Sequence, residues 1–308
     1  MTSPIAARSA RYSTYGPAGV LSIETRDVAA PAPGKVRVAV RAAGLNPADS
    51  KIREGLWPSL PAQFPAGIGR EMSGVVEAVG DDVTLVAVGD EVFGNVAGSA
   101  IAEYVLTNQI NLAKKPAELD WITAGGMSLA GQTAWDSVAS QSLTAEDVVL
   151  VSAAAGGVGS LTAQLAVRSG ALVIGTASER NHEYLRSIGV IPVAYGDGLV
   201  ERVREAAGDR AVTVVFDHHG AETVEAGLAL GVDPSRINTI AADAEALGVV
   251  HVGRGPINAA TLEELARLVV AGELVIDVDA TYPLDDVVAA FEHLDGGHVR
   301  GKVVITID

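Results

Sequence analysis

The sequence predicts an α/β protein with two domains, an antiparallel, barrel-like domain and a doubly wound parallel sheet. Two patterns along the chain support this fold class. From Val36 to about Leu112, short β-rich runs are separated by turn residues, whereas after Trp121 β-rich runs alternate with helix-like runs. The first pattern is typical of hairpins and corners, and the second of parallel strands covered by helices. A chain of 308 residues, 48% of them hydrophobic, can bury a large core.

The first domain is expected to comprise residues 1–122 and 261–308. Its β-rich runs include KVRVAVRAAG, SGVVEAVGDDV, GDEVFGNV and AEYVLT. Glycine and aspartate lie at the joints between these runs, and both residues favour tight turns. The segment from residue 274 to residue 308 ends in the β-rich run GKVVITID and is therefore assigned to this domain.

The second domain is expected over residues 123–260. Its strands are DVVLVSA, ALVIGTAS, IPVAYG, VTVVFDHHG, INTIA and GVVHVGR, and helix-like runs such as SLTAQLAVRSG and LVERVREAAG lie between them. Strands that alternate with helices form parallel sheets, because each helix returns the chain to the same end of the sheet.

Composition excludes several classes of function. The chain has no cysteine, so disulfides, iron–sulfur clusters, thiol nucleophiles and cysteine-ligated zinc are excluded. A formal net charge of −16 would repel nucleic acid and anionic membranes, so neither is expected as a partner. The run MTSPIAARSARYSTYG lacks the apolar centre of a signal peptide, and no apolar run approaches the roughly 20 residues of a membrane span. A cytoplasmic protein is therefore expected.

The run VLVSAAAGGVGSLTAQLA, residues 149–166, carries the strongest functional signal. Ala154, Gly156 and Gly159 have the spacing G-x-G-x-x-G, with alanine in the first place. The second glycine lets the backbone approach a pyrophosphate, the third lets the helix pack on the strand, and the N-terminus of the helix attracts phosphate. The alternative is a tight turn with small residues for packing. The position between a strand and a helix, at the start of a series of such units, favours a dinucleotide.

The residues after the next strand indicate which dinucleotide binds. In NAD-binding sheets an acidic residue about 20 residues after the glycine motif binds the ribose 2′-hydroxyl. Here the strand ALVIGTAS ends at Ser178, followed by Glu179 and Arg180. A hydroxyl and a guanidinium suit a 2′-phosphate, because arginine can pair with it through two hydrogen bonds. Ser178 and Arg180 therefore predict NADP. In the alternative, this is a solvated turn in which Glu179 serves NAD.

Five runs span nearly the full length of the chain in a familiar order: AAGLNPADSKIREG, GIGREMSGVVEAVG, VGDEVFG, AAAGGVGSLTAQLA and GHVRGKVV. This series resembles the medium-chain dehydrogenase/reductase superfamily, specifically its zinc-independent, zeta-crystallin-like quinone oxidoreductase branch. The resemblance implies a GroES-like antiparallel β-barrel catalytic domain and a Rossmann cofactor domain. It also implies an NADPH-dependent oxidoreductase that reduces quinones or α,β-unsaturated carbonyl compounds by hydride transfer without zinc. An alternative is an NADPH-binding sensor or structural protein with little turnover.

The resemblance also predicts that no metal binds. Zinc-bearing members of the superfamily carry a cysteine ligand at the position of Asn46 and a histidine ligand at that of Arg70, so both ligands are replaced here. His218 and His219 are adjacent on an expected strand and point to opposite faces, so they cannot easily bind one ion. Their place at the end of that strand predicts instead that they line the cofactor cleft.

Cofactor contacts are implied residue by residue at the matching positions. The chain departs from its relatives in having no acidic residue before Tyr195, which weakens that assignment. For Arg300 and Lys302 the alternative is a basic end to a surface turn. The implied contacts are Ala154, Gly156, Gly157, Val158 and Gly159 at the pyrophosphate, Ser178 and Arg180 at the 2′-phosphate, and elsewhere Thr133, Tyr195, Ile240, Ala241, Ala242, Val252, Arg300 and Lys302.

The expected chemistry needs a donor for the charge that develops on a substrate oxygen. Asn46 and Lys51, in the loop that resembles the substrate-facing edge, are the catalytic candidates, and Asp49 is expected to order that loop. The alternative for Lys51 is an ordinary solvated lysine. With 13 aromatic residues (Phe 4, Trp 3, Tyr 6), the cleft is expected to be largely aliphatic and the substrate small and apolar. A homodimer is expected, paired through the edge strand GVVHVGR.

Overall fold

The computed structural model describes residues 3–253 and 255–308, in two compact units. Unit 1 comprises Met1–Ala130 and Ile257–Asp308, and unit 2 comprises Gly131–Pro256. The expected boundaries, 122/123 and 260/261, differ from the boundaries in the structure, which lie at 130/131 and 256/257. Helix α2 (Trp121–Gly125) belongs to unit 1, where Ser73 Oγ donates a hydrogen bond to the Trp121 carbonyl oxygen at 2.6 Å. Helix α9 (Ala259–Val270) also lies in unit 1 as a whole.

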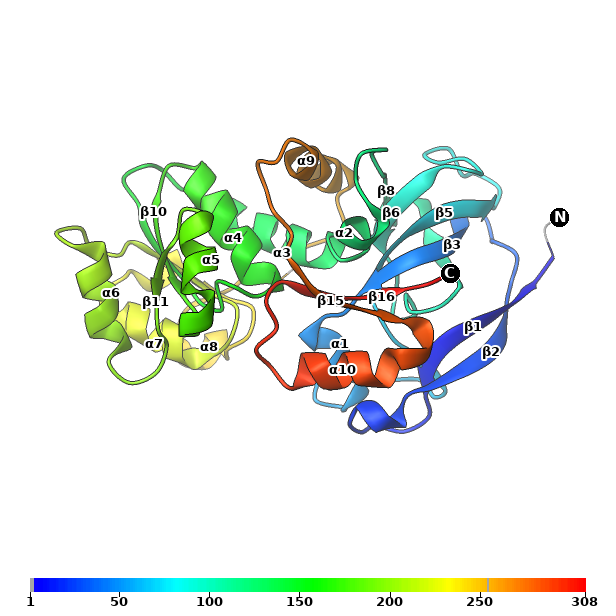
Figure 1. Cartoon of the computed structure of the whole chain (residues 1–308), viewed down its shortest axis with the longest axis horizontal. Coiled ribbons are helices and arrows are strands. Elements are labelled where there is room, and N and C mark those ends of the chain that lie inside the picture. Colours follow the sequence, from blue (N-terminus) through cyan, green and yellow to red (C-terminus); the bar gives the residue numbers. More distant parts are fainter. Residues whose placement is uncertain (1–2, 254) are drawn as a thin grey trace. The chain divides into compact units, whose positions relative to one another are not determined.

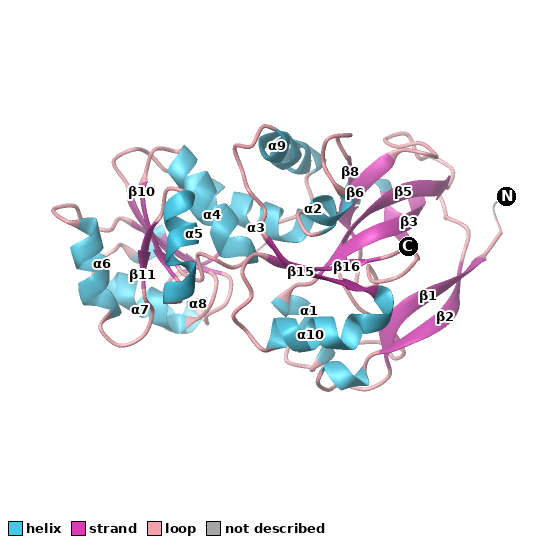
Figure 2. Ribbon diagram, viewed as in Figure 1, coloured by secondary structure: helices cyan, strands magenta, loops and turns pink. Residues whose placement is uncertain are grey.

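Unit 1 contains two sheets (Figure 2). The smaller has the strand order β2-β1-β4, and the larger has the order β15-β16-β3-β5-β6-β8, with β7 also pairing with β3. Every pair is antiparallel, as predicted, except β15 with β16. That pair is parallel because helix α10 crosses over between the two strands. The bounds are β1 Ile5–Tyr12, β2 Ser22–Val28, β3 Lys35–Gly44, β4 Ala66–Gly67, β5 Glu71–Val79, β6 Glu91–Asn95, β7 Tyr104–Asn108, β8 Leu112–Lys114, β15 Val278–Pro283, α10 Val287–Asp295 and β16 Lys302–Thr306.

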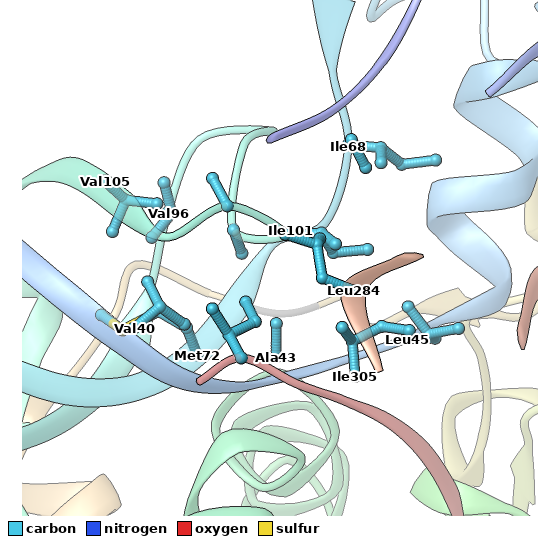
Figure 3. Packing of buried hydrophobic residues seen from close by; sticks show 14 of the residues in the cluster. Val40, Ala43, Leu45, Ile68, Met72, Val96, Ile101, Val105, Leu284 and Ile305 are labelled. Carbon is cyan, nitrogen blue, oxygen red and sulfur yellow. The ribbon is translucent and has the colours of Figure 1, made fainter. Parts of the chain in front are cut away.

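Apolar side chains from these sheets and from α10 form the core of unit 1 (Figure 3). Leu45, Met72 and Val303 are almost completely buried in it. Each is followed or preceded in the chain by a polar residue, and burying the apolar neighbour fixes the backbone of the polar one. The residues labelled in Figure 3 are Val40, Ala43, Leu45, Ile68, Met72, Val96, Ile101, Val105, Leu284 and Ile305.

Unit 2 is a six-stranded parallel sheet with helices packed on both faces (Figure 1). Its order is β11-β10-β9-β12-β13-β14, so the direction of winding reverses between β9 and β12. Val148 and Leu150 of β9 pack in a cluster with residues of α6 and α7, whereas Val149 and Val151 pack in a second cluster with residues of α4 and α5. Strand β9 is buried on both faces, which explains its uninterrupted apolar run. The bounds are β9 Val148–Val151, α4 Gly157–Arg168, β10 Leu172–Thr176, α5 His182–Ser187, β11 Ile191–Val193, α6 Leu199–Ala207, β12 Val214–Asp217, α7 Ala221–Ala229, β13 Ile237–Thr239, α8 Ala244–Leu247 and β14 Val250–His251.

The remaining helices are α1 (Pro47–Arg53) in unit 1 and α3 (Ser128–Ala139), which contains the boundary at 130/131. The expected edge strand GVVHVGR is shorter than predicted: β14 has two residues, and Arg254 lies outside the described residues. Within the described ranges, no helix combines the length and the apolar surface that a membrane span requires.

Candidate functional site

The glycine-rich turn of unit 2 joins β9 to α4 and is fastened to the neighbouring strand β10. Ala154 N donates to the Thr176 carbonyl oxygen at 2.9 Å, and Ala153 N donates to Thr176 Oγ1 at 3.2 Å. Gly156 N donates to the Ala153 carbonyl oxygen at 2.8 Å, which closes the turn directly before the helix. The turn before α4 is therefore held by hydrogen bonds to β10 and within the turn itself.

Two glycines of this turn, Gly156 and Gly159, meet different surroundings. A Cβ at Gly159 would lie 2.2 Å from the Ala153 carbonyl oxygen and 2.9 Å from that of Ser152, so the helix can pack this close only with glycine. A Cβ at Gly156 would meet the Ala153 carbonyl oxygen at 3.3 Å as its one neighbour within 4 Å among the described residues. Gly159 therefore serves packing, whereas Gly156 leaves room over the backbone, which is the arrangement that a pyrophosphate requires.

The α4 helix supplies the favourable field for phosphate. It has 12 residues and begins with Gly157, Val158 and Gly159, with Gly156 as its N-cap. The first N–H groups of a helix have no carbonyl partner within the helix, and the helix dipole places positive charge at that end. The residues of this unit therefore fit the diphosphate of a dinucleotide without a basic side chain.

Ser178 and Arg180 lie in the turn that follows β10. Ser178 is the N-cap of a 3-10 turn, Glu179–Asn181, and is half-buried, whereas Glu179 and Arg180 are exposed. Asn181 Nδ2 donates to Ser178 Oγ at 3.4 Å. The expected pair thus lies two residues apart at the carboxyl end of a strand adjacent to β9.

The other expected contacts of unit 2 lie in or next to the same carboxyl edge. Tyr195 follows β11 and is 50% exposed, and Val252 follows β14. Ala241 N and Ala242 N donate to Thr239 Oγ1 at 3.0 and 2.8 Å, and Ile240 N donates to the Asp217 carbonyl oxygen at 3.0 Å. Thr133 lies instead in α3, where it is buried.

A buried aspartate that the sequence pattern did not reveal joins three strands at this edge. Asp217 Oδ1 accepts hydrogen bonds from Ser152 Oγ at 2.8 Å and from the backbone N–H groups of His219 and Gly220 at 3.0 Å. Its Oδ2 accepts from Thr239 Oγ1 at 2.5 Å. The signal in the sequence was an acidic residue directly after an apolar run, VTVVFD, next to the reversal point where ligands of such sheets bind.

His218 is held beside this network. Its backbone N–H donates to Ser152 Oγ at 2.7 Å. Both ring nitrogens are buried without a hydrogen-bond partner among residues 3–253 and 255–308. Burial lowers the pKa of His218 to about 4, so the ring is neutral at pH 7.

In unit 1, strand register brings together Asn46, Glu71 and Lys302. Val304 of β16 pairs with Gly44 of β3 in an antiparallel arrangement. Lys302, two residues before Val304, therefore comes opposite Asn46, two residues after Gly44. Lys302 Nζ donates to Asn46 Oδ1 at 2.7 Å, to Glu71 Oε1 at 2.7 Å and to the Leu45 carbonyl oxygen at 2.8 Å. Asn46 Nδ2 donates to Glu71 Oε1 at 2.8 Å. The sequence pattern did not predict this cluster, because residues 71 and 302 are far apart in the chain.

Lys302 and Arg300 lie in different surroundings. Lys302 is 3% exposed, and its three hydrogen bonds to protein acceptors account for the three protons of its ammonium group. It is therefore not the basic end of a surface turn. The Arg300 side chain is 44% exposed and forms an ion pair with Asp277.

The loop at Asn46 is ordered by Asp49, as expected. Asp49 Oδ2 accepts from Asn46 N at 3.0 Å, and Asp49 N donates to the Asn46 carbonyl oxygen at 2.8 Å, which starts α1 at Pro47. Burial raises the pKa of Asp49 to about 7, against the opposing charge of Arg70. Lys51, further along α1, is exposed to solvent.

Asn46 and Arg70, which stand where zinc-bearing members of the superfamily have their ligands, do not fit a zinc ion. Arg70 has no lone pair to donate, and the amide oxygen of Asn46 accepts a hydrogen bond from the Lys302 ammonium at 2.7 Å. A divalent cation at this oxygen would meet that positive charge. No group of three or more histidine, cysteine, aspartate or glutamate side chains that could hold a metal occurs within the described part of the chain.

Known proteins resemble this chain over nearly its full length. The family model for the alcohol dehydrogenase GroES-like domain matches residues 32–141, and the model for zinc-binding dehydrogenases matches residues 189–305. The chloroplastic NADPH-dependent alkenal/one oxidoreductase of Arabidopsis thaliana is 30% identical over 96% of this chain and 78% of its own length. The quinone oxidoreductase of Homo sapiens is 26% identical over 97% of this chain and 98% of its own length.

Two solved structures agree with these matches. The quinone oxidoreductase from Coxiella burnetii has a TM-score of 0.89 and 29% identity, covering 99% of this chain and 100% of its own. The Escherichia coli quinone oxidoreductase complexed with NADPH has a TM-score of 0.87 and 27% identity, covering 97% of this chain and 99% of its own. The chain therefore belongs to the medium-chain dehydrogenase/reductase superfamily of oxidoreductases.

Proposed function

We propose that this protein is an NADPH-dependent reductase that transfers hydride to quinones or α,β-unsaturated carbonyl compounds without zinc. The observation that carries the proposal is the turn between β9 and α4, which is packed tightly at Gly159 and open at Gly156. The names of the relatives support the same cofactor and substrate class, because they include an NADPH-dependent alkenal/one oxidoreductase and quinone oxidoreductases.

Unit 2 would hold the cofactor. The backbone from Gly156 to Gly159 would bind the diphosphate at the α4 N-terminus, and Ser178 with Arg180 would bind the 2′-phosphate. When bound, the nicotinamide supplies the hydride.

Unit 1 would supply the donor for the substrate. Hydride addition to a conjugated carbonyl places negative charge on its oxygen, and a fixed N–H group stabilises that charge. Asn46 is suited to this role because its amide is held in place by hydrogen bonds with Glu71 and Lys302. Lys51 is exposed to solvent, so its ammonium group is not fixed in one place. We therefore assign the main donor role to Asn46.

The function is tested by mixing the purified protein with NADPH and a panel of ortho- and para-quinones, 2-alkenals and enones. We expect loss of the near-ultraviolet NADPH absorbance with at least one acceptor class, undiminished after treatment with a metal chelator. Absence of NADPH consumption with the whole panel would reject the reductase. Tight NADPH binding in that case would favour the sensor or structural alternative.

We also propose that the protein is a homodimer paired through β14. This strand is the edge of the unit 2 sheet, and both of its residues are exposed, Val250 by 38%. An unpaired edge can extend its sheet across a two-fold axis. Light scattering should give twice the mass of one chain, and Val250→Lys should shift the protein to the monomer; a wild-type monomer would reject this pairing.

A further inference from the structure

We infer that Lys302 and Glu71 are positioning residues that set the Asn46 amide in one orientation, with an Nδ2 proton left for the substrate oxygen. The inference rests on the proposed function of Asn46 as the donor. Three features of the cluster carry it: the chemistry of its hydrogen bonds, the way it is held in the fold, and its burial.

The hydrogen bonds allow only one orientation of the amide. A lysine ammonium can only donate, so the Asn46 atom 2.7 Å from Lys302 Nζ must be the oxygen. A glutamate carboxylate can only accept, so the atom 2.8 Å from Glu71 Oε1 must be the nitrogen. Rotation of the amide by half a turn would place its nitrogen against Lys302 Nζ, donor against donor, and its oxygen against Glu71 Oε1, acceptor against acceptor. Both contacts are costly in a buried site. The ion pair thus distinguishes the two ends of the amide.

The remaining bonds hold the two charged groups themselves. Lys302 Nζ also donates to the Leu45 carbonyl oxygen, next to Asn46 in the chain. Glu71 Oε2 accepts from Leu129 N at 2.7 Å, so the carboxylate cannot rotate without losing a backbone partner. Gly44 makes this approach possible, because a Cβ there would lie 2.6 Å from Glu71 Oε1. The fold therefore fixes both groups that face the amide.

All three residues are buried, and the Asn46 amide is the group with a donor proton left over. Glu71 is 0% exposed and Lys302 is 3% exposed, whereas Asn46 is 6% exposed. Of the two Nδ2 protons, one is donated to Glu71, and the second has no acceptor among residues 3–253 and 255–308. In this inference the two charged groups act on the substrate through the amide.

The test is a double-mutant cycle between Asn46→Ala and the neutral pair Glu71→Gln/Lys302→Met. The neutral pair of substitutions removes both charges together, so that no single charge is left buried. If Asn46 contacts the reacting oxygen, Asn46→Ala lowers kcat by about 10²-fold or more. We expect the neutral pair to lower kcat at least tenfold while Asn46 is present, and to have little further effect on kcat once Asn46 has been replaced by alanine. Independent, multiplying losses in kcat would overturn the inference, because they would indicate a role that does not pass through Asn46.

A second measurement does not depend on activity. The side-chain amide protons of Asn46 can be followed by NMR in isotope-labelled protein, with the Asn46→Asp variant to assign them. We expect two separate signals, with the proton bonded to Glu71 protected from solvent exchange, and loss of that protection in the neutral pair. Unchanged signals in the neutral pair would overturn the positioning role even if the protein reduces its substrates. An inactive protein with the expected signals would instead reject the proposed function and leave the positioning intact.

Discussion

Lys302 Nζ lies 2.7 Å from Glu71 Oε1, and both residues are buried, with 3% and 0% of their surface exposed. This ion pair joins the first residue of β16 to the first residue of β5 in unit 1. Both charges have lost their water, and each depends on the other and on its hydrogen bonds for compensation.

Removal of one partner should therefore cost more than removal of both. Lys302→Met leaves a buried carboxylate without its cation and should lower the free energy of unfolding by about 3–5 kcal/mol. Glu71→Gln/Lys302→Met leaves no uncompensated charge and should cost less. Urea unfolding of the wild type and the two variants measures the difference. Equal losses of unfolding free energy in the single and double variants would show that the two charges do not compensate each other.

Substitutions at Gly156 and Gly159 of the β9–α4 turn should separate packing from cofactor binding. Gly159→Ala places a Cβ 2.2 Å from a backbone oxygen and should lower both thermal stability and NADPH affinity. Gly156→Ala meets one backbone oxygen at 3.3 Å, a milder contact, so stability should fall less than in Gly159→Ala, but the added methyl group should obstruct the diphosphate. Thermal unfolding and fluorescence titration with NADPH give the two readouts. NADPH affinity unchanged in Gly156→Ala would contradict the binding role of this turn.

Arg180 should decide between NADPH and NADH. Its guanidinium would pair with the 2′-phosphate, which NADH lacks, so Arg180→Ala should weaken NADPH binding by about tenfold or more and leave NADH binding nearly unchanged. Glu179→Ala is the matched control in the same turn, and it should favour NADPH slightly by removing a negative charge. Parallel losses of affinity for both cofactors in Arg180→Ala would contradict the assignment.

His218 should make stability depend on pH. Burial lowers its pKa from 6.5 to about 4, so between these values the unfolded chain binds more protons at this residue than the folded chain. Its contribution to stability is therefore present above pH 6.5 and is lost as the pH falls toward 4. His218→Gln should reduce this loss in urea unfolding at several pH values. An unchanged slope would mean that the ring titrates as freely in the folded protein as in the unfolded chain.

Asp49 should have the opposite effect on the pH dependence of stability. Burial raises its pKa from 3.8 to about 7, so in this range the folded chain binds more protons at this residue than the unfolded chain. Its contribution to stability therefore falls as the pH rises from about 4 to 7. Asp49→Asn carries no charge, so its stability relative to the wild type should increase with pH over the same range. A constant difference between the two proteins would contradict the shifted pKa.

The local patterns of the sequence predicted the fold, because a strand buried on both faces and a glycine turn leave direct marks in the chain. The run VLVSAAAGGVG predicted β9, its turn and the start of α4. The parallel pairing of β15 with β16 and the place of α2 in unit 1 depend on contacts between distant segments, and the sequence pattern does not contain them.

The candidate site was predicted unevenly for the same reason. The positions of Gly156 and Ser178 follow from their own strands, whereas Lys302 was expected near the cofactor or at a surface turn and lies buried between Asn46 and Glu71. Its surroundings are set by strand register across β16, β3 and β5. Asp217 was overlooked because two of its partners, Ser152 and Thr239, lie at the ends of two other strands.

The proposed hydride transfer is tested most directly by following an isotope through a single turnover. Metal-free protein is mixed with NADPH that carries deuterium on the transferable position of the nicotinamide and with a 2-alkenal, and the product is analysed by mass spectrometry. We expect a saturated aldehyde that has gained deuterium on carbon, and a much slower gain with the Asn46→Ala variant. A product without deuterium, or deuterium transfer that requires added zinc, would contradict the proposed reaction.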